Sequence, residues 1–223
     1  MSDASALLGK QIELQLIGHN LFTGVLTDLS SDMLVLFTEQ RFFYFPILHV
    51  RRLNLSTDSQ KNSDISPPIG FYIAEEKTDM SYRKVLMYAK GIFSEIYVTG
   101  KISLHGYIMN VFNDYFTFYS PVYKLMYISL HHLKWLTPYT QGERPYSLTH
   151  EQFPINPTSL PLYRSLEEQL KTIEGKLVVF DGGEDPKRMG LLKNSENSMV
   201  ELVTAKGERI YLNLTQIQTV HVP

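Results

Sequence analysis

The sequence predicts a mainly β protein made of three tandem copies of a small five-stranded barrel, with short helices before some of the copies. Three observations lead to this prediction: a glycine motif that occurs three times, a tyrosine motif that follows it at a nearly constant distance, and short segments in which apolar and polar residues alternate between turn signals. An aromatic content of 12% also favours β structure.

The first landmark is a glycine followed by two apolar or aromatic residues and, two positions later, by Asp or Asn. It occurs at Gly24, Gly106 and Gly190. A glycine inside a strand pattern is typical of a bulge or a sharp bend. We therefore expect each copy to contain a central strand that bends at this point.

The second landmark is a tyrosine with apolar residues at the first, third and sixth positions after it. It occurs at Tyr44, Tyr127 and Tyr211, which are 20, 21 and 21 residues after the glycines. A closing apolar residue follows 9 positions later each time, at Leu53, Leu136 and Val220. Two landmarks at fixed separation indicate a true repeat.

The remaining strands follow from alternation between these landmarks. Opening strands are predicted at 11–16, 95–98 and 176–180, and strands after a polar turn at 33–37, 115–119 and 199–203. Helical periodicity predicts a helix over 162–173, and 81–92 has a similar pattern.

These elements divide the chain into barrels at 1–55, 80–137 and 162–223. The linkers are then 56–79 and the proline-rich 138–161. Segment 69–74 is too apolar for a free linker and is expected to wrap a barrel. Because a barrel this small is marginal alone, we expect the three to pack on one another.

Composition excludes several function classes. A net charge of -2 gives no overall field for phosphate backbones or anionic membranes, and no apolar stretch reaches the ~18 residues of a membrane span, so membrane insertion is not expected. The absence of cysteine removes thiolate metal sites and cysteine nucleophiles. No phosphate loop, dinucleotide fingerprint, nucleophile elbow or paired-histidine metal helix is present, so we expect neither enzyme activity nor a cofactor.

A histidine cluster and an aromatic run are the candidate functional residues. His49, His131 and His132 occupy one repeat position after the tyrosine strand, which favours a hydrogen-bonded turn over the alternative of a zinc site. In the run that contains Phe42 and Phe45, alternate side chains face the core, and the others are available to a neighbouring barrel or chain or, alternatively, to single-stranded nucleic acid.

The ends of a barrel array are the expected interaction surface. Small barrels are incompletely closed, so a linear array leaves one unpaired edge at each end. We expect these edges at strands 42–45 and 211–214, and we expect Leu212→Pro to disrupt pairing there. The candidate interaction surface thus consists of Phe42, Phe45, His49, His131, His132 and Leu212.

The helix, the bent glycine strand and the late tyrosine strand resemble the Sm-like superfamily, whose classical members are RNA-binding rings. The chain departs from those rings at their nucleotide-binding positions. Ser30 and Leu34 stand where the rings carry an aspartate and an asparagine, and the basic pair near the last turn is missing at 45–46, 128–129 and 212–213. The resemblance implies the fold, and the departures predict weak or absent binding of nucleic acid.

The chain also resembles the spore coat protein B family of endospore-forming bacilli, whose members look like three Sm-like repeats. Segments 43–51 and 126–134 match that family's tyrosine and histidine stretch, and 182–185 resembles its Gly-Gly-Pro-Glu turn. We expect this chain to differ from the best-known relative in lacking its Ser/Lys/Arg-rich tail. The resemblance implies a structural protein made in the mother-cell cytoplasm and deposited in the spore coat, with other coat proteins or itself as partners. The alternative is a cytoplasmic Sm-like nucleic-acid-binding regulator.

Overall fold

The computed structural model describes residues 4–56, 80–98, 103–140, 143, 145–147 and 161–223. The predicted linker residues 57–79 and 148–160, including the apolar segment 69–74, lie outside this part. Within it, no helix has the length and apolar character needed to cross a membrane.

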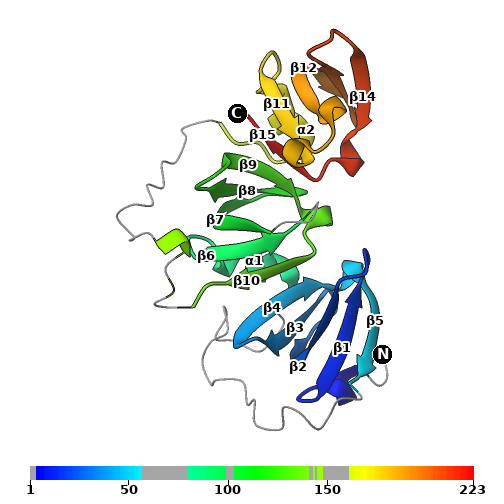
Figure 1. Ribbon diagram of the computed structural model, residues 1–223, viewed down its shortest axis with the longest axis vertical. Coiled ribbons are helices and arrows are strands. Elements are labelled where there is room, and N and C mark those ends of the chain that lie inside the picture. Colours follow the sequence, from blue (N-terminus) through cyan, green and yellow to red (C-terminus); the bar gives the residue numbers. More distant parts are fainter. Residues whose placement is uncertain (1–3, 57–79, 99–102, 141–142, 144, 148–160) are drawn as a thin grey trace.

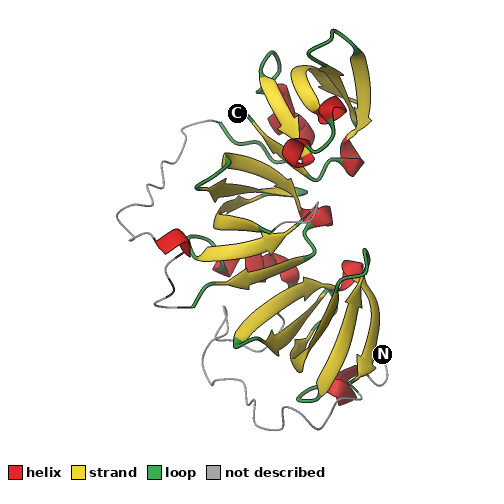
Figure 2. Cartoon of the chain, in the orientation of Figure 1, coloured by secondary structure: helices red, strands yellow, loops and turns green. Residues whose placement is uncertain are grey.

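The described chain forms one open antiparallel sheet, and the prediction of a mainly β protein is confirmed (Figures 1 and 2). The sheet contains three consecutive groups of five strands, which we call repeats one, two and three. Repeat one comprises β1 (Gln11–Leu16), β2 (Leu21–Leu29), β3 (Met33–Thr38), β4 (Arg41–Pro46) and β5 (Val50–Leu55). Repeat two comprises β6 (Phe93–Tyr97), β7 (Leu104–Val111), β8 (Tyr115–Ser120), β9 (Lys124–Ser129) and β10 (Trp135–Pro138). Repeat three comprises β11 (Leu177–Phe180), β12 (Met189–Glu196), β13 (Met199–Val203), β14 (Arg209–Asn213) and β15 (Thr219–His221).

Strand order is the same in all three repeats. In each, the fourth, third, second, first and fifth strands lie side by side in that order. The repeats are stacked along the long axis of the molecule (Figure 1). The three landmark tyrosines all lie in fourth strands, in β4, β9 and β14.

A short helical segment precedes each first strand. These segments are the 3-10 turn η1 (Ala4–Leu7), α1 (Tyr82–Tyr88) and α2 (Leu166–Lys171). The side chains of Ser81 and Ser165 cap α1 and α2 at their N-termini, and the helices end at the C-caps Ala89 and Thr172, so both are shorter than predicted. Leu162, which the periodicity placed in the helix, lies before this cap.

The landmark glycines are required by close approach of the backbone. A Cβ atom at Gly24 would lie 2.7 Å from the carbonyl oxygen of Phe37, and one at Gly106 or Gly190 would overlap the equivalent carbonyl of the facing strand. The register between second and third strands shifts a few residues further on in every repeat, between Leu26 and Asp28 in the first. The glycine therefore does precede a bulge, as predicted.

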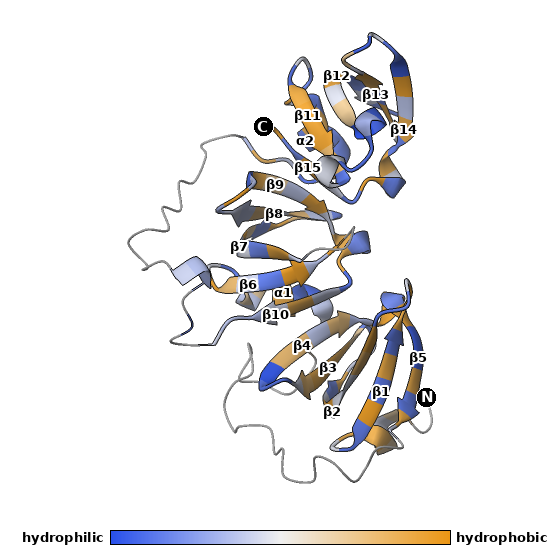
Figure 3. Ribbon diagram, in the orientation of Figure 1, coloured by the Kyte–Doolittle hydropathy of each residue, from blue (hydrophilic) through white to orange (hydrophobic). Residues whose placement is uncertain are grey.

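The fourth strands divide their aromatic side chains between two cores. Phe43 and Phe45 are buried in the core of repeat one, together with Trp135 from β10. Phe42 and Tyr44 instead enter a second core that contains Leu86 of α1 and most of the buried residues of repeat two. Apolar and polar residues alternate along β1 (Figure 3), whereas residues 33–37 of β3 are all apolar and buried. Each repeat thus completes part of its neighbour's core.

The third core has the same construction. Tyr115 and Tyr127 of repeat two are buried beside Leu170 of α2 and the apolar strand residues of repeat three. The cores of repeats two and three are therefore both built with residues of the preceding repeat, which explains why such small units occur as a continuous stack.

The unpaired ends of the sheet differ in one respect from the prediction. Strand β4, which contains Phe42–Phe45, is not an edge, because it pairs with β10 of repeat two. The terminal strands of the sheet are β14, as expected, and β5. The fourth strand of one repeat pairs with the fifth strand of the next. The strands without such a partner in the described chain are therefore the fifth strand of repeat one and the fourth strand of repeat three.

Candidate interaction site at the repeat junctions and sheet ends

The two junctions between repeats use the same strand pairing in the same register. At the first junction, Leu136 of β10 lies opposite Tyr44 of β4. At the second, Val220 of β15 lies opposite Tyr127 of β9. In both cases the closing apolar residue of one repeat meets the landmark tyrosine of the preceding repeat.

An aspartate in the turn between the second and third strands accepts a hydrogen bond from the N-terminus of the next repeat's helix. The backbone N–H of Tyr82, at the start of α1, donates to Asp32 Oδ1 at 3.1 Å. The N–H of Leu166, at the start of α2, donates to Asp114 Oδ1 at 2.9 Å. A carboxylate at a helix N-terminus accepts from a backbone N–H that has no partner within the helix, and its negative charge interacts favourably with the positive end of the helix dipole. Ser198 occupies this position in repeat three.

A histidine position lies at both junctions, but it forms a direct link at only one. His132 Nε2 lies 2.7 Å from the carbonyl oxygen of Thr215 in repeat three. His49, at the equivalent position of repeat one, is buried near His131, which is the residue equivalent to Thr215, and among the described residues its Nε2 has no hydrogen-bond partner. Gln216 occupies the histidine position of repeat three.

The environment of His49 favours its neutral form. Burial lowers the pKa of His49, the nearby His131 backbone partly opposes this, and the charge of Lys134 lowers the pKa further. Burial also lowers the pKa of His221, which lies in the junction strand β15. Within the residues described, no group of three or more metal-ligating side chains could hold a metal ion.

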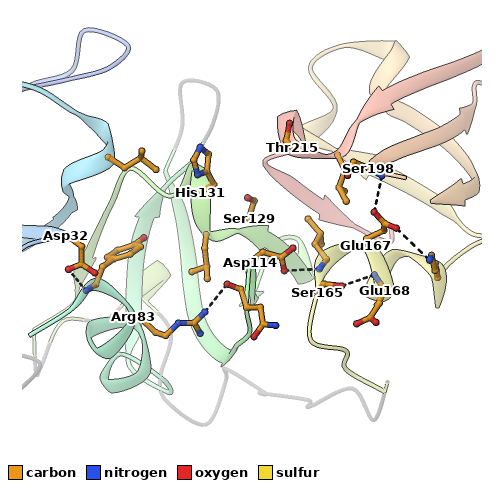
Figure 4. A pocket seen from close by; sticks show the side chains of 17 residues that line it. Asp32, Arg83, Asp114, Ser129, His131, Ser165, Glu167, Glu168, Ser198 and Thr215 are labelled. Carbon is orange, nitrogen blue, oxygen red and sulfur yellow. Dashed lines mark hydrogen bonds and ion pairs between the residues drawn. The ribbon is translucent and has the colours of Figure 1, made fainter. Parts of the chain in front are cut away.

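A cavity of about 980 Å³ lies where the turns of all three repeats gather (Figure 4). Its charged lining residues are Asp32, Arg83, Asp114, Glu167, Glu168 and Lys171.

Several of these charged groups are already engaged in holding the turns. Arg83 donates to the carbonyl oxygens of Phe112 at 2.6 Å and Asn113 at 2.9 Å. Glu167 accepts from the N–H of Ser198 at 3.0 Å and lies 3.7 Å from Lys171 Nζ. The lining therefore serves the structure of the junctions, and its four carboxylates make it unfavourable for a phosphate.

The outward face of the third and fourth strands is covered in repeats one and two but not in repeat three. Met33 and Tyr44 are fully buried by repeat two. Their equivalents in repeat three, Met199 and Tyr211, are 40% and 60% exposed. On the same two strands, Arg209 Nη1 lies 3.4 Å from Glu201 Oε1. Repeat three therefore presents an uncovered face of mixed apolar and charged character.

Hydrogen bonding within repeat three fixes which main-chain groups of β14 point outward. The N–H of Leu214 donates to the carbonyl of Ser198 at 2.9 Å, and the antiparallel register continues from this pair. Since residues of an antiparallel strand alternate between the two sides, Leu212 bonds toward β13, and Tyr211 points its N–H and C=O away from the sheet.

The same reasoning applies at the other end of the sheet. The N–H of Ser56 donates to the carbonyl of Gln11 at 3.1 Å, in register with the pairing of β5 and β1. Asn54 therefore bonds toward β1, and Leu53 points its main-chain groups outward. Within the described chain, these outward groups of β5 and β14 have no strand partner.

Comparisons with known proteins place the chain in a family. The "Uncharacterized protein YwrJ" of Bacillus subtilis (strain 168) is 41% identical to it over 226 residues, which cover 100% of both chains. The chain belongs to the YwrJ family. In addition, a family model described as the YwrJ third domain matches residues 165–220, which run from the cap of α2 into β15. No solved structure matches the chain.

In this YwrJ-family chain, the predicted interaction residues differ in where they lie and in how far they are buried. Phe42, Phe45 and His49 are buried at or beside the first junction. His131 lines the cavity, and His132 joins repeats two and three. Leu212 is partly buried against the core of repeat three, so its exposed neighbour Tyr211 is the edge residue.

Sequence reasoning missed the linking aspartates and a second glycine landmark. Asp32, Asp114 and Ser198 each lie 8 positions after a landmark glycine. Another glycine lies 15 positions before each landmark, at Gly9, Gly91 and Gly175, always with a positive φ and with its N–H bonded to the second strand. These constant spacings were available in the sequence, but their role between repeats depends on which strands meet.

Proposed function

We propose that this chain is a non-enzymatic structural protein that assembles through strand pairing at the free ends of its sheet. The observation that supports the proposal best is the free edge of β14. In repeats one and two, the equivalent strand is paired and its outward face is buried by the next repeat. In repeat three, the same face is uncovered and exposes Tyr211 and Met199.

The proposed setting is the spore coat. This part of the proposal rests on the resemblance to the spore coat protein B family, with three Sm-like barrels, synthesis in the mother cell and contacts with coat proteins or other copies of the chain. The internal strand pairing supports a role in assembly, because an exposed edge recruits a partner through main-chain hydrogen bonds.

The test is incorporation into the coat of a spore-forming bacillus that expresses the tagged chain. Wild type should appear only during sporulation and should co-purify with coat material. Tyr211→Pro, which removes an outward N–H, should stay in the soluble fraction, whereas Tyr211→Ala keeps that N–H and should retain at least part of the incorporation. A chain present in vegetative cells and absent from coat extracts would contradict the proposal.

A second candidate is a cytoplasmic Sm-like nucleic-acid-binding regulator. One observation favours it: the cavity gathers the turns of all three repeats on one side of the sheet and includes Arg83 and Lys171. The carboxylates of Asp114 and Glu167 oppose it. Oligouridine binding that is micromolar or tighter, and that weakens steeply with salt, would favour this candidate, because counterion release accompanies phosphate contact.

A further inference from the structure

We infer that the partner of the free β14 edge is a second copy of this chain, whose β5 pairs antiparallel with β14 in one register, with Leu53 opposite Tyr211. This inference rests on the proposed function and specifies the partner. It predicts head-to-tail contact between repeat three of one copy and repeat one of the next.

The register follows from the two junctions inside the chain. At both, the fifth strand of one repeat pairs with the fourth strand of the preceding repeat, and the closing apolar residue lies opposite the tyrosine. The strands left free are a fifth strand and a fourth strand. Their closing residue is Leu53 and their tyrosine is Tyr211, so the same rule gives one pairing.

Main-chain groups on the two edges are complementary in this register. Leu53 and Tyr211 both point their N–H and C=O outward, so they form a hydrogen-bonded pair. The neighbouring pairs are Arg52 with Leu212 and Asn54 with Ile210, and neither brings like charges together.

The contact between chains should be weaker than the junctions within the chain. Ser198 replaces the linking aspartate, Gln216 replaces the histidine, and the short turn η1 stands where α1 and α2 stand in the other repeats. Strand pairing would be retained with fewer additional links. Association should therefore rise with protein concentration over the range of a scattering experiment.

Disulfide trapping tests the register directly, because the chain has no cysteine of its own. Asn54→Cys is introduced in one preparation and Ile210→Cys in another, and the two are mixed under mild oxidation. In the inferred register these residues form a non-hydrogen-bonded pair with Cα atoms ~4.5 Å apart, within the range of a disulfide. Arg52→Cys mixed with Ile210→Cys is the matched control, since this diagonal separation is ~7–8 Å.

We expect a disulfide to form between the two chains in the 54–210 mixture, several-fold faster than in the 52–210 mixture. Adding Tyr211→Pro to the Ile210→Cys chain should abolish it. Equal linkage in both mixtures, or none where wild type scatters as an assembly, would overturn it, as would a wild type that stays monomeric. If coat incorporation still depends on the Tyr211 N–H while no 54–210 disulfide forms, the edge binds another protein. In that case this inference fails and the proposed function stands.

Discussion

Single polar side chains hold the stack of repeats together at its turns. Asp32 and Asp114 each accept a hydrogen bond from the first N–H of the next repeat's helix, so one carboxylate belongs to a turn of its own repeat and satisfies a helix donor of its neighbour. Such a residue contributes to two units at once, and its loss should be felt in both.

Asp114→Ala should lower the free energy of unfolding by about 1 kcal/mol, the usual effect of removing a side chain that accepts from an N–H at a helix N-terminus. Ser198→Ala is the matched control, because Ser198 occupies the same repeat position and its side chain caps no described helix. Urea denaturation of both variants measures the difference. Equal effects of the two substitutions would show that the link to α2 contributes nothing.

Buried histidines at the junctions should make stability depend on pH. Burial lowers the folded-state pKa of His49 and His221 below the ordinary value of 6.5, so the unfolded chain binds more protons below that pH. The stabilisation from their neutral rings is complete above about pH 6.5 and is lost as the pH falls toward the folded-state values.

The urea midpoint, measured between pH 7.5 and pH 5 at intervals of ~0.5 pH unit, tests this pH dependence. The slope of stability against pH reports the number of protons that the chain takes up on unfolding. The double variant His49→Gln, His221→Gln should lose less stability on acidification than wild type does. A variant with the same acid sensitivity as wild type would assign the pH dependence to other groups.

At the scale of elements, the two sides of β14 have different roles. Its inward groups, including Leu212, complete the ladder with β13, and its outward groups, including Tyr211, are free for a partner strand. A proline at adjacent positions should therefore have opposite consequences for folding and for assembly.

Leu212→Pro should destabilise the fold by about 1–3 kcal/mol, because it removes a ladder hydrogen bond and leaves a carbonyl of β13 unsatisfied. Tyr211→Pro removes only an outward donor and should change the free energy of unfolding much less. Thermal unfolding followed by circular dichroism compares the two. A Tyr211→Pro chain as unstable as Leu212→Pro would mean that the assigned alternation of the strand is wrong.

The elements themselves were largely predictable from sequence, but their partners were not. Strand β1 and strand β13 have the predicted bounds, and the landmark glycines do precede bulges, because alternation and backbone crowding are local properties. The pairing of β4 with β10 was missed, since a strand's hydrophobic pattern does not state which neighbour covers its second face. For the same reason, the sequence pointed to Leu212 and not to Tyr211 as the edge residue.

The whole molecule is a short array in which each repeat depends on its neighbour. Repeat three lacks the residues that make the outgoing links of repeats one and two, and repeat one has only a short turn in place of the helix. Terminal repeats that differ from internal ones are characteristic of repeat arrays. The shared cores imply that the repeats unfold together.

Trp135, the single tryptophan of the chain, provides a fluorescence probe of this coupling. It belongs to repeat two but packs into the core of repeat one, where the centroid of its ring lies 5.4 Å from that of Phe43. Leu170 is fully buried in the core of repeat three, in a different cluster. Leu170→Ala should cost about 2–5 kcal/mol, as is usual for a large-to-small change in a core. If the array unfolds as one unit, this distant substitution lowers the urea midpoint reported by Trp135 fluorescence as much as the midpoint reported by far-ultraviolet circular dichroism. An unchanged fluorescence midpoint, with a second transition in the dichroism, would instead show that repeat three unfolds independently and that its shared core with repeat two is a weak link.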